Sequence, residues 1–134
     1  MSLADPEASS YYKAVSGGLI GNSDGSIINC FATGKVKATS NYYKYPDSAV
    51  EIGGLSGYIY KSTENIVNCF IYELQTFERI IDVTYNDPTN TIGEICTTDQ
   101  LNSSDFYTQS LGWDSSVWDF SNLDFENGKM PTLK

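Results

Sequence analysis

The first ninety residues of the chain alternate short apolar runs with turns that are rich in Gly, Asn and Asp. The pattern predicts a short strand around residues 18–20, a tight turn at residues 22–25 and a second strand through residues 26–32. Thr, Val, Ile and Tyr, which favour strands, are common here, whereas Ala and Leu are sparse. The pattern therefore predicts an all-β fold.

The same pattern occurs twice in the same order, which indicates a repeat architecture. Gly17-Gly18-Leu19 returns as Gly53-Gly54-Leu55 at an offset of 36 residues, and Asn29-Cys30-Phe31 returns as Asn68-Cys69-Phe70 at an offset of 39. The second copy therefore contains small insertions, which loops tolerate better than strands do. A third, degraded copy is expected to start at Ile92-Gly93, with Gly93 taking the place of Gly53.

Stacked copies would place equivalent residues in columns, so we expect the repeated residues to be structural. Glycine permits positive φ angles or a close approach of neighbouring backbone. The repeated Asn is expected to bond to nearby backbone or to its equivalent at a corner of the chain, and the repeated Cys is expected to point into the core. The structural residues are Gly18, Leu19, Gly21, Asn29, Cys30, Gly54, Leu55, Gly57, Asn68 and Cys69.

After Cys96 the composition changes to short helical signals followed by closely spaced apolar residues. Residues 97–100 have the spacing of a capping box, and residues 103–106 can begin a second helical turn. We expect residues 97–134 to form a short helical and aromatic cap that lies over an end of the stacked repeats. The chain of 134 residues is then one domain, with the repeats at 10–96 and a cloning scar or linker at 1–9.

Charge and composition exclude several classes of function. The net charge is −9, which disfavours nucleic-acid binding, and the absence of histidine removes the commonest zinc ligand and general base. The three cysteines form no CxxC pair and predict neither a zinc site nor a disulfide framework. We expect no cofactor and no catalytic or metal-binding residue. The sequence also has no apolar run long enough to cross a membrane.

Residues 82–87, which begin and end with Asp, could offer oxygen ligands to calcium together with Asn86 and Asn90. The twelve-residue order of an EF-hand and the RTX nonapeptide are both absent from this stretch. A solvated loop is therefore the preferred interpretation.

Gly18-Leu19-Ile20-Gly21 resembles the GLUG motif, a Gly-Leu pair followed by a hydrophobic residue and a glycine. Residues 25–36 are similar to the extended form of the motif, whereas the second copy departs from it by placing Ser56 at the hydrophobic position. GLUG motifs occur in tandem in bacterial surface proteins, including adhesin-like proteins and regions of immunoglobulin A-cleaving metallopeptidases. The resemblance implies a parallel β-helix-like solenoid of two to three glycine-led repeats in an extracytoplasmic protein. It implies no active site.

The exposed tyrosines are the candidates for ligand binding. Alternate residues of a strand share a face, so two such rings can lie side by side and stack on a sugar. The candidates lie in two predicted loops and comprise Tyr42, Tyr43, Tyr45, Tyr58 and Tyr60. Sealing the outer surface of a solenoid is the preferred interpretation of such rings.

The sequence favours a non-catalytic structural or adhesive module of a larger bacterial surface or secreted protein. A host or matrix glycan or protein is a possible partner, as is the rest of the longer parent chain. The alternative is a carbohydrate-binding module that uses the tyrosine loops. A carbohydrate-active enzyme is disfavoured, because the carboxylates do not cluster in the sequence and glycoside hydrolysis needs two of them at a suitable separation.

Overall fold

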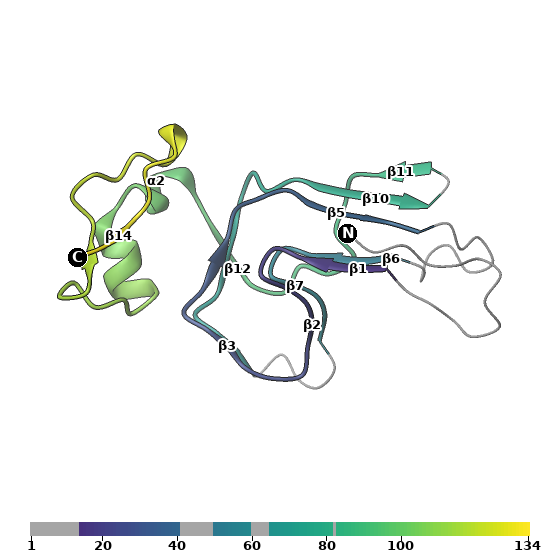
Figure 1. The fold of residues 1–134 in the computed structure, drawn as a ribbon, viewed down its shortest axis with the longest axis horizontal. Coiled ribbons are helices and arrows are strands. Elements are labelled where there is room, and N and C mark those ends of the chain that lie inside the picture. Colours follow the sequence, from purple (N-terminus) through teal and green to yellow (C-terminus); the bar gives the residue numbers. More distant parts are fainter. Residues whose placement is uncertain (1–13, 41–49, 60–64, 82) are drawn as a thin grey trace.

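The computed structural model describes residues 14–40, 50–59, 65–81 and 83–134, and in these residues the chain is mostly β-structure with a few short helices. The chain winds through two similar coils that lie along one another, with the C-terminal segment beside them (Figure 1). The first coil contains β1 (Ala14–Gly17), β2 (Ile20–Ser23), β3 (Ile27–Ile28), β4 (Phe31–Ala32) and β5 (Val36–Thr39). The second contains β6 (Val50–Gly53), β7 (Ser56–Ile59), β8 (Ile66–Val67), β9 (Phe70–Tyr72) and β10 (Phe77–Ile81).

Each strand of the first coil pairs in parallel with its counterpart in the second. Ala14 pairs with Val50, an offset of 36 residues, and Phe31 pairs with Phe70, an offset of 39. The register therefore matches the repeat that is visible in the sequence. The extra residues of the second copy lie between strands, where they do not disturb the pairing.

Two further strands and a bridge lie against the second coil. The strand β12 (Glu94–Cys96) pairs in parallel with β9, whereas β11 (Val83–Tyr85) folds back antiparallel to β10. An isolated parallel bridge joins Gly53 to Asn90. Asn90, and not Gly93, is therefore the third equivalent of Gly17 and Gly53. The expected alignment of Gly93 with Gly53 is wrong, because the chain between β11 and β12 meets the second coil three residues earlier.

The expected strand around residues 18–20 and the expected continuous strand through residues 26–32 are both interrupted. The chain bends at residues 18–19, between β1 and β2, and again at residues 29–30, between β3 and β4. Asn29 and its equivalent Asn68 have φ angles of 58° and 52° in the left-handed region, which Asn adopts more readily than most residues. An apolar run interrupted by one Asn therefore turns a corner here.

Side chains of β4 and β9 alternate between the inside of the coils and their outer face. Ala32 and Ile71 are buried inside, in a cluster with Leu55 and Cys69. Phe31 and Phe70 point outward from the same two strands. The interior continues into a second cluster formed by β1, β5, β6 and β10, which contains Ala14, Val36, Ala38, Val50, Ile52 and Ile81. The coils are therefore thin and enclose mostly small or aliphatic side chains.

The C-terminal segment packs against the outer face of the β4, β9 and β12 sheet, beside the coils (Figure 1). It contains α2 (Thr98–Leu101), a π-helical turn η2 (Phe106–Ser110), β13 (Trp118–Asp119), a 3-10 turn η3 (Phe125–Asn127) and β14 (Thr132–Leu133). The capping box predicted at the start of α2 is present. We expected the segment to cover an end of the stack. It lies beside the stack instead, because the rings against which it packs point sideways from β4 and β9.

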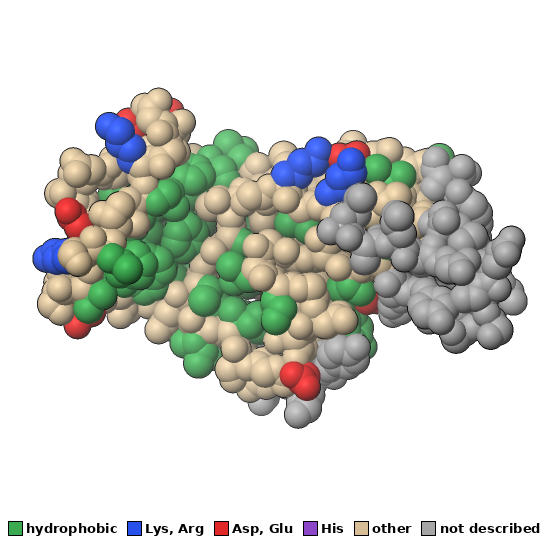
Figure 2. All heavy atoms as spheres, in the orientation of Figure 1, with side chains coloured by type: hydrophobic (Ala, Val, Ile, Leu, Met, Phe, Trp, Pro, Cys, Tyr) green, Lys and Arg blue, Asp and Glu red, His purple; other side chains and the backbone are tan. Residues whose placement is uncertain are grey.

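Aromatic rings join this segment to the coils. The ring of Phe106 lies edge-on to those of Phe31 and Phe70, with centroids 6.3 and 5.0 Å apart. The indole N–H of Trp113 donates a hydrogen bond of 2.9 Å to the backbone carbonyl of Asn29. Hydrophobic side chains accordingly fill the space between the two parts in Figure 2. Within the described residues no helix is long and apolar enough to span a bilayer.

Candidate functional site

The two corner asparagines form one column across the coils. The side-chain amide of Asn68 donates a hydrogen bond of 3.1 Å to the side-chain oxygen of Asn29. The backbone N–H of Asn29 also bonds to the carbonyl of Val67 in the second coil. The column therefore links the coils at a corner where the regular strand pairing is interrupted.

The cysteines follow the same columns but differ in burial. Cys69 is 3% exposed, whereas Cys30 is half-buried, so the expectation of a core position fails in part for Cys30. The physical reason is the position of each residue in the stack. Cys69 lies between the first coil and the chain leading into β12, whereas Cys30 lies in the first coil, whose described strands pair on one side only. Burial raises the pKa of the Cys69 thiol. All three cysteines are free thiols. Cys96 is fully buried on the face of the β4, β9 and β12 sheet that packs against the C-terminal segment.

The repeated glycines allow the coils to approach closely. A Cβ atom on Gly18 would lie 2.1 Å from the carbonyl oxygen of Gly54, and one on Gly57 would lie 2.5 Å from the Val15 side chain. A Cβ on Gly54 would meet Ile71 at 2.6 Å. These distances leave no room for a side chain. Gly21 has a looser environment, because a Cβ added there would lie 3.5 Å from its nearest neighbouring atom.

The leucine of the repeat differs in burial between the two coils. Leu55 is fully buried, whereas its neighbour in the column, Leu19, is 44% exposed. The same contrast occurs at the other end, where Ile71 is 5% exposed and its partner Ile95 is 59% exposed. At these two positions the side chain is buried in the second coil and exposed in the layer beside it, whereas other side chains of the first coil, such as Ala14 and Ala32, are buried in its interior.

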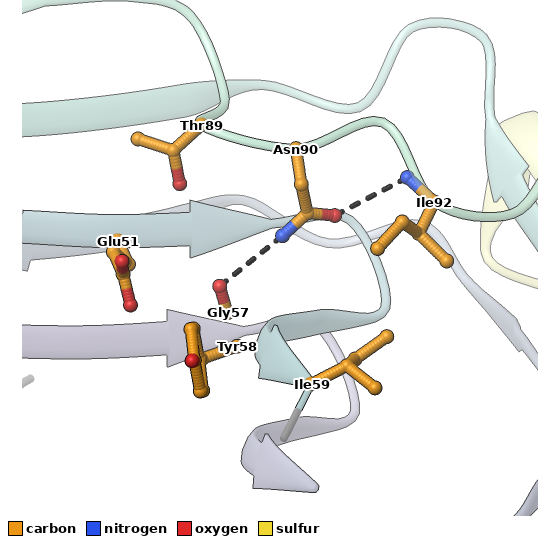
Figure 3. A pocket seen from close by; sticks show the side chains of 7 residues that line it. All are labelled: Glu51, Gly57, Tyr58, Ile59, Thr89, Asn90 and Ile92. Atoms are coloured by element: carbon orange, nitrogen blue, oxygen red, sulfur yellow. Dashed lines mark hydrogen bonds between the residues drawn. The ribbon is translucent and has the colours of Figure 1, made fainter. Parts of the chain in front are cut away.

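Of the candidate tyrosines, the structure places Tyr58, while Tyr42, Tyr43, Tyr45 and Tyr60 lie outside the described residues. Tyr58 is 37% exposed and borders a hollow of about 230 Å³ on the second coil. The hollow is lined by Glu51, Gly57, Tyr58, Ile59, Thr89, Asn90 and Ile92 (Figure 3). It is the hollow that the described tyrosine candidate borders, and the carboxylate of Glu51 also lines it.

Most hydrogen-bonding groups of Asn90 in this hollow are already used. The amide nitrogen of Asn90 donates to the carbonyl of Ser56 at 3.0 Å. It also donates to the carbonyl of Gly57 at 3.1 Å, and the side-chain oxygen accepts from the N–H of Ile92 at 3.2 Å (Figure 3). An edge strand normally presents such carbonyls unpaired. The side chain of Asn90 therefore bonds to backbone carbonyls at the edge of β7, as a third strand would.

Thr89 does the same for β6. Its hydroxyl accepts a hydrogen bond of 2.8 Å from the N–H of Ile52 and donates one of 2.9 Å to the carbonyl of the same residue. The backbone N–H of Thr89 donates to this carbonyl as well, at 2.8 Å. Together with β11 and β12, Thr89 and Asn90 cover most of the outer edge of the second coil. Sequence reasoning missed this role of both residues: it considered Asn90 only as a calcium ligand, although Asn90 follows Gly53 at about the repeat distance.

The charged groups near the coils form surface pairs. The Lys35 amine, just before β5, lies 2.7 Å from the Glu78 carboxylate on β10, and Arg79 bonds to Asp87 at 3.0 Å. These cations hold the pKa of both carboxyls below the usual values. Asp87 belongs to the stretch that could offer calcium ligands, and here it pairs with arginine. The described residues contain no group of three or more metal-ligating side chains of the Cys, Asp, Glu or His type.

Comparison with known families gives one match. Residues 15–37 match the family model of the GLUG motif. The chain carries a GLUG motif. The matched residues run from β1 into β5, so the GLUG motif corresponds to the first coil, and the second coil repeats its path in register. Searches of curated proteins and of solved structures find no match to the chain.

Proposed function

We propose that this GLUG-motif chain is a structural segment of a parallel β-solenoid within a larger extracytoplasmic bacterial protein. The observation that carries the proposal is the parallel pairing of each first-coil strand with its counterpart one repeat later. A stack held by backbone hydrogen bonds between coils is stiff along its axis, since each coil contacts its neighbours over its whole path. Such a segment acts as a spacer or as a support for adhesive loops.

The two edges of the stack differ, and the difference indicates at which coil the proposed solenoid ends. Thr89, Asn90, β11 and β12 occupy most of the outer edge of the second coil. The described strands of the first coil pair on one side only, and Leu19 is exposed there. We therefore place the end of the solenoid at the second coil and its continuation, the rest of a longer parent chain, at the first.

A non-catalytic role agrees with the distribution of carboxylates. Four hollows in the described part of the chain each have one acidic residue in their lining: Glu51, Glu94, Glu78 and Asp119. Hydrolysis of a glycosidic bond needs a pair of carboxyl groups about 5 to 10 Å apart. The absence of histidine from the whole chain also removes the most common general base.

Hydrogen exchange tests the solenoid. The backbone N–H of Phe70 donates to Cys30 in the first coil, and that of Gly18 donates to Gly54 in the second. Because the two coils protect each other, we expect amides of both to exchange in one cooperative step. Asn68→Ala should speed exchange in both coils, whereas Asn127→Ala, in the C-terminal segment, should leave the coils unchanged. Independent exchange of the two coils would contradict the proposal.

The second candidate function is glycan binding, favoured by the exposed ring of Tyr58 beside the 230 Å³ hollow. A glycan array separates it from the spacer role. A spacer should give no saturable binding, whereas a binding module should lose its signal in Tyr58→Ala and keep it in Tyr85→Ala, which removes an exposed ring on β11. Release of reducing sugar ends from any polysaccharide would contradict the non-catalytic proposal.

A further inference from the structure

Cys30 and Cys69 occupy equivalent positions in neighbouring coils. The pairs that flank them, Ile28 with Val67 and Phe31 with Phe70, are in parallel register. Neighbouring strands lie about 4.8 Å apart, and a disulfide accepts Cα separations of about 4.4 to 6.8 Å. The register therefore brings the two cysteines within the range of a covalent link.

The two thiols also converge on the same short strand. The Cys30 thiol donates a hydrogen bond of 3.1 Å to the carbonyl of Ile28, and the Cys69 thiol donates one of 3.2 Å to the carbonyl of Ile27. Ile27 and Ile28 are adjacent and form β3 of the first coil. The Cys69 sulfur also lies 3.3 Å from the carbonyl oxygen of Val67 in its own coil, so it lies between the two coils.

The two cysteines differ in access to reagents, and the difference sets an order of reaction. Cys30 lies in the first coil and is half-buried, whereas Cys69 lies in the second coil and is 3% exposed. A reagent from solution reaches Cys30 first. Cys96 is fully buried among the aromatic rings on the other face of the sheet and has no cysteine beside it, so it serves as an internal control.

We propose that Cys30 and Cys69 form a modification site at which a low-molecular-weight disulfide, such as oxidised glutathione, cross-links the two coils. The Cys30 thiolate attacks one sulfur of the reagent, forms a mixed disulfide and releases one glutathione thiol. The Cys69 thiolate then attacks the Cys30 sulfur and releases the second. Two protein thiols are oxidised by two electrons, the reagent is reduced to two thiols, and their protons pass to the products.

The cross-link joins positions 39 residues apart and restricts the unfolded chain, so it should stabilise the coils. It would also fix the corner that the Asn29 and Asn68 side chains already join. Its formation needs the stacked register alone and is therefore independent of the proposed spacer role.

The test is equilibration of the folded protein with oxidised and reduced glutathione, then alkylation and peptide mapping by mass spectrometry. We expect a peptide pair linked through Cys30 and Cys69, a loss of two hydrogens from the protein mass, and alkylation at Cys96. The melting temperature should rise by several degrees and return after reduction.

Three variants make the result decisive. Cys69→Ser should stop at a mixed disulfide on Cys30, whereas Cys30→Ser should leave Cys69 reduced. Cys96→Ser should still cross-link. The proposal is overturned if the parent protein also stops at the mixed disulfide, if its thiols stay reduced, or if the link forms no faster in the folded protein than in urea.

Discussion

The side-chain amide of Asn68 donates a hydrogen bond of 3.1 Å to the side-chain oxygen of Asn29, one coil away, and both residues have left-handed backbone angles. Each Asn thus turns the chain and links it to the next layer. Because a corner cannot continue the regular strand pairing, the side-chain bond replaces part of what the backbone loses there.

Substitution at this corner should separate the two effects. We expect Asn68→Ala to lower the free energy of unfolding by about 1–2 kcal/mol, because alanine resists the left-handed conformation and cannot make the bond. Asn68→Gly should cost less, since glycine adopts this conformation freely. Chemical denaturation measures both. Equal losses in the two variants would show that backbone conformation contributes nothing.

The repeat glycine Gly18 should tolerate no side chain. The carbonyl of Gly54 lies 2.1 Å from the position of an added Cβ, and backbone cannot move aside without breaking the pairing of the coils. We expect Gly18→Ala to cost about 3 kcal/mol through overpacking. Gly34→Ala is the matched control, because nothing lies within 4 Å of its added Cβ. Thermal unfolding of the two variants gives the comparison.

The hydrogen bonds of the Thr89 hydroxyl should contribute more to the free energy of unfolding than the packing of its side chain does. Thr89→Val keeps the volume but removes the two hydrogen bonds between the hydroxyl and Ile52, while the backbone N–H of Thr89 still bonds to the Ile52 carbonyl. We expect a loss of about 1–3 kcal/mol. Thr89→Ser retains the hydroxyl and should lose less. Exposing the edge of β6 should also promote self-association, which sedimentation velocity detects. A Val variant as stable and monomeric as the parent would refute the edge-capping role.

The cluster that joins the C-terminal segment to the coils, which includes Cys96 and Tyr107, should lose its packing at alkaline pH. Burial raises the pKa of Cys96 to about 11 and that of Tyr107 to about 12. A group whose folded pKa lies above its unfolded value stabilises the fold below the unfolded pKa, and this stabilisation is lost as pH rises toward the folded pKa. Stability should therefore fall progressively from about pH 9 to pH 12, over the range spanned by the ordinary and raised values.

Tryptophan fluorescence during alkaline titration tests this, because Trp113 contacts the ring of Tyr107. Cys96→Ala should move the first part of the transition to higher pH. Cys30→Ala, outside the cluster, should leave the titration unchanged. A transition that is the same in all three proteins would exclude Cys96 as a cause.

The sequence alone determined the β class, the repeat and the register of the coils. Glycine and asparagine recurred at fixed places because their backbone and packing requirements are local, so the pattern survives in the residue order. The capping box at Thr97 was equally local and equally readable.

Tertiary structure decided the rest. Nothing local distinguishes Cys30 from Cys69, and their burial differs because one layer has neighbours on both sides. The aromatic segment lies beside the coils because Phe31 and Phe70 point outward, a direction that depends on the corners at Asn29 and Asn68. The edge-capping roles of Thr89 and Asn90 depend on contacts with residues more than thirty positions away, which no local pattern records.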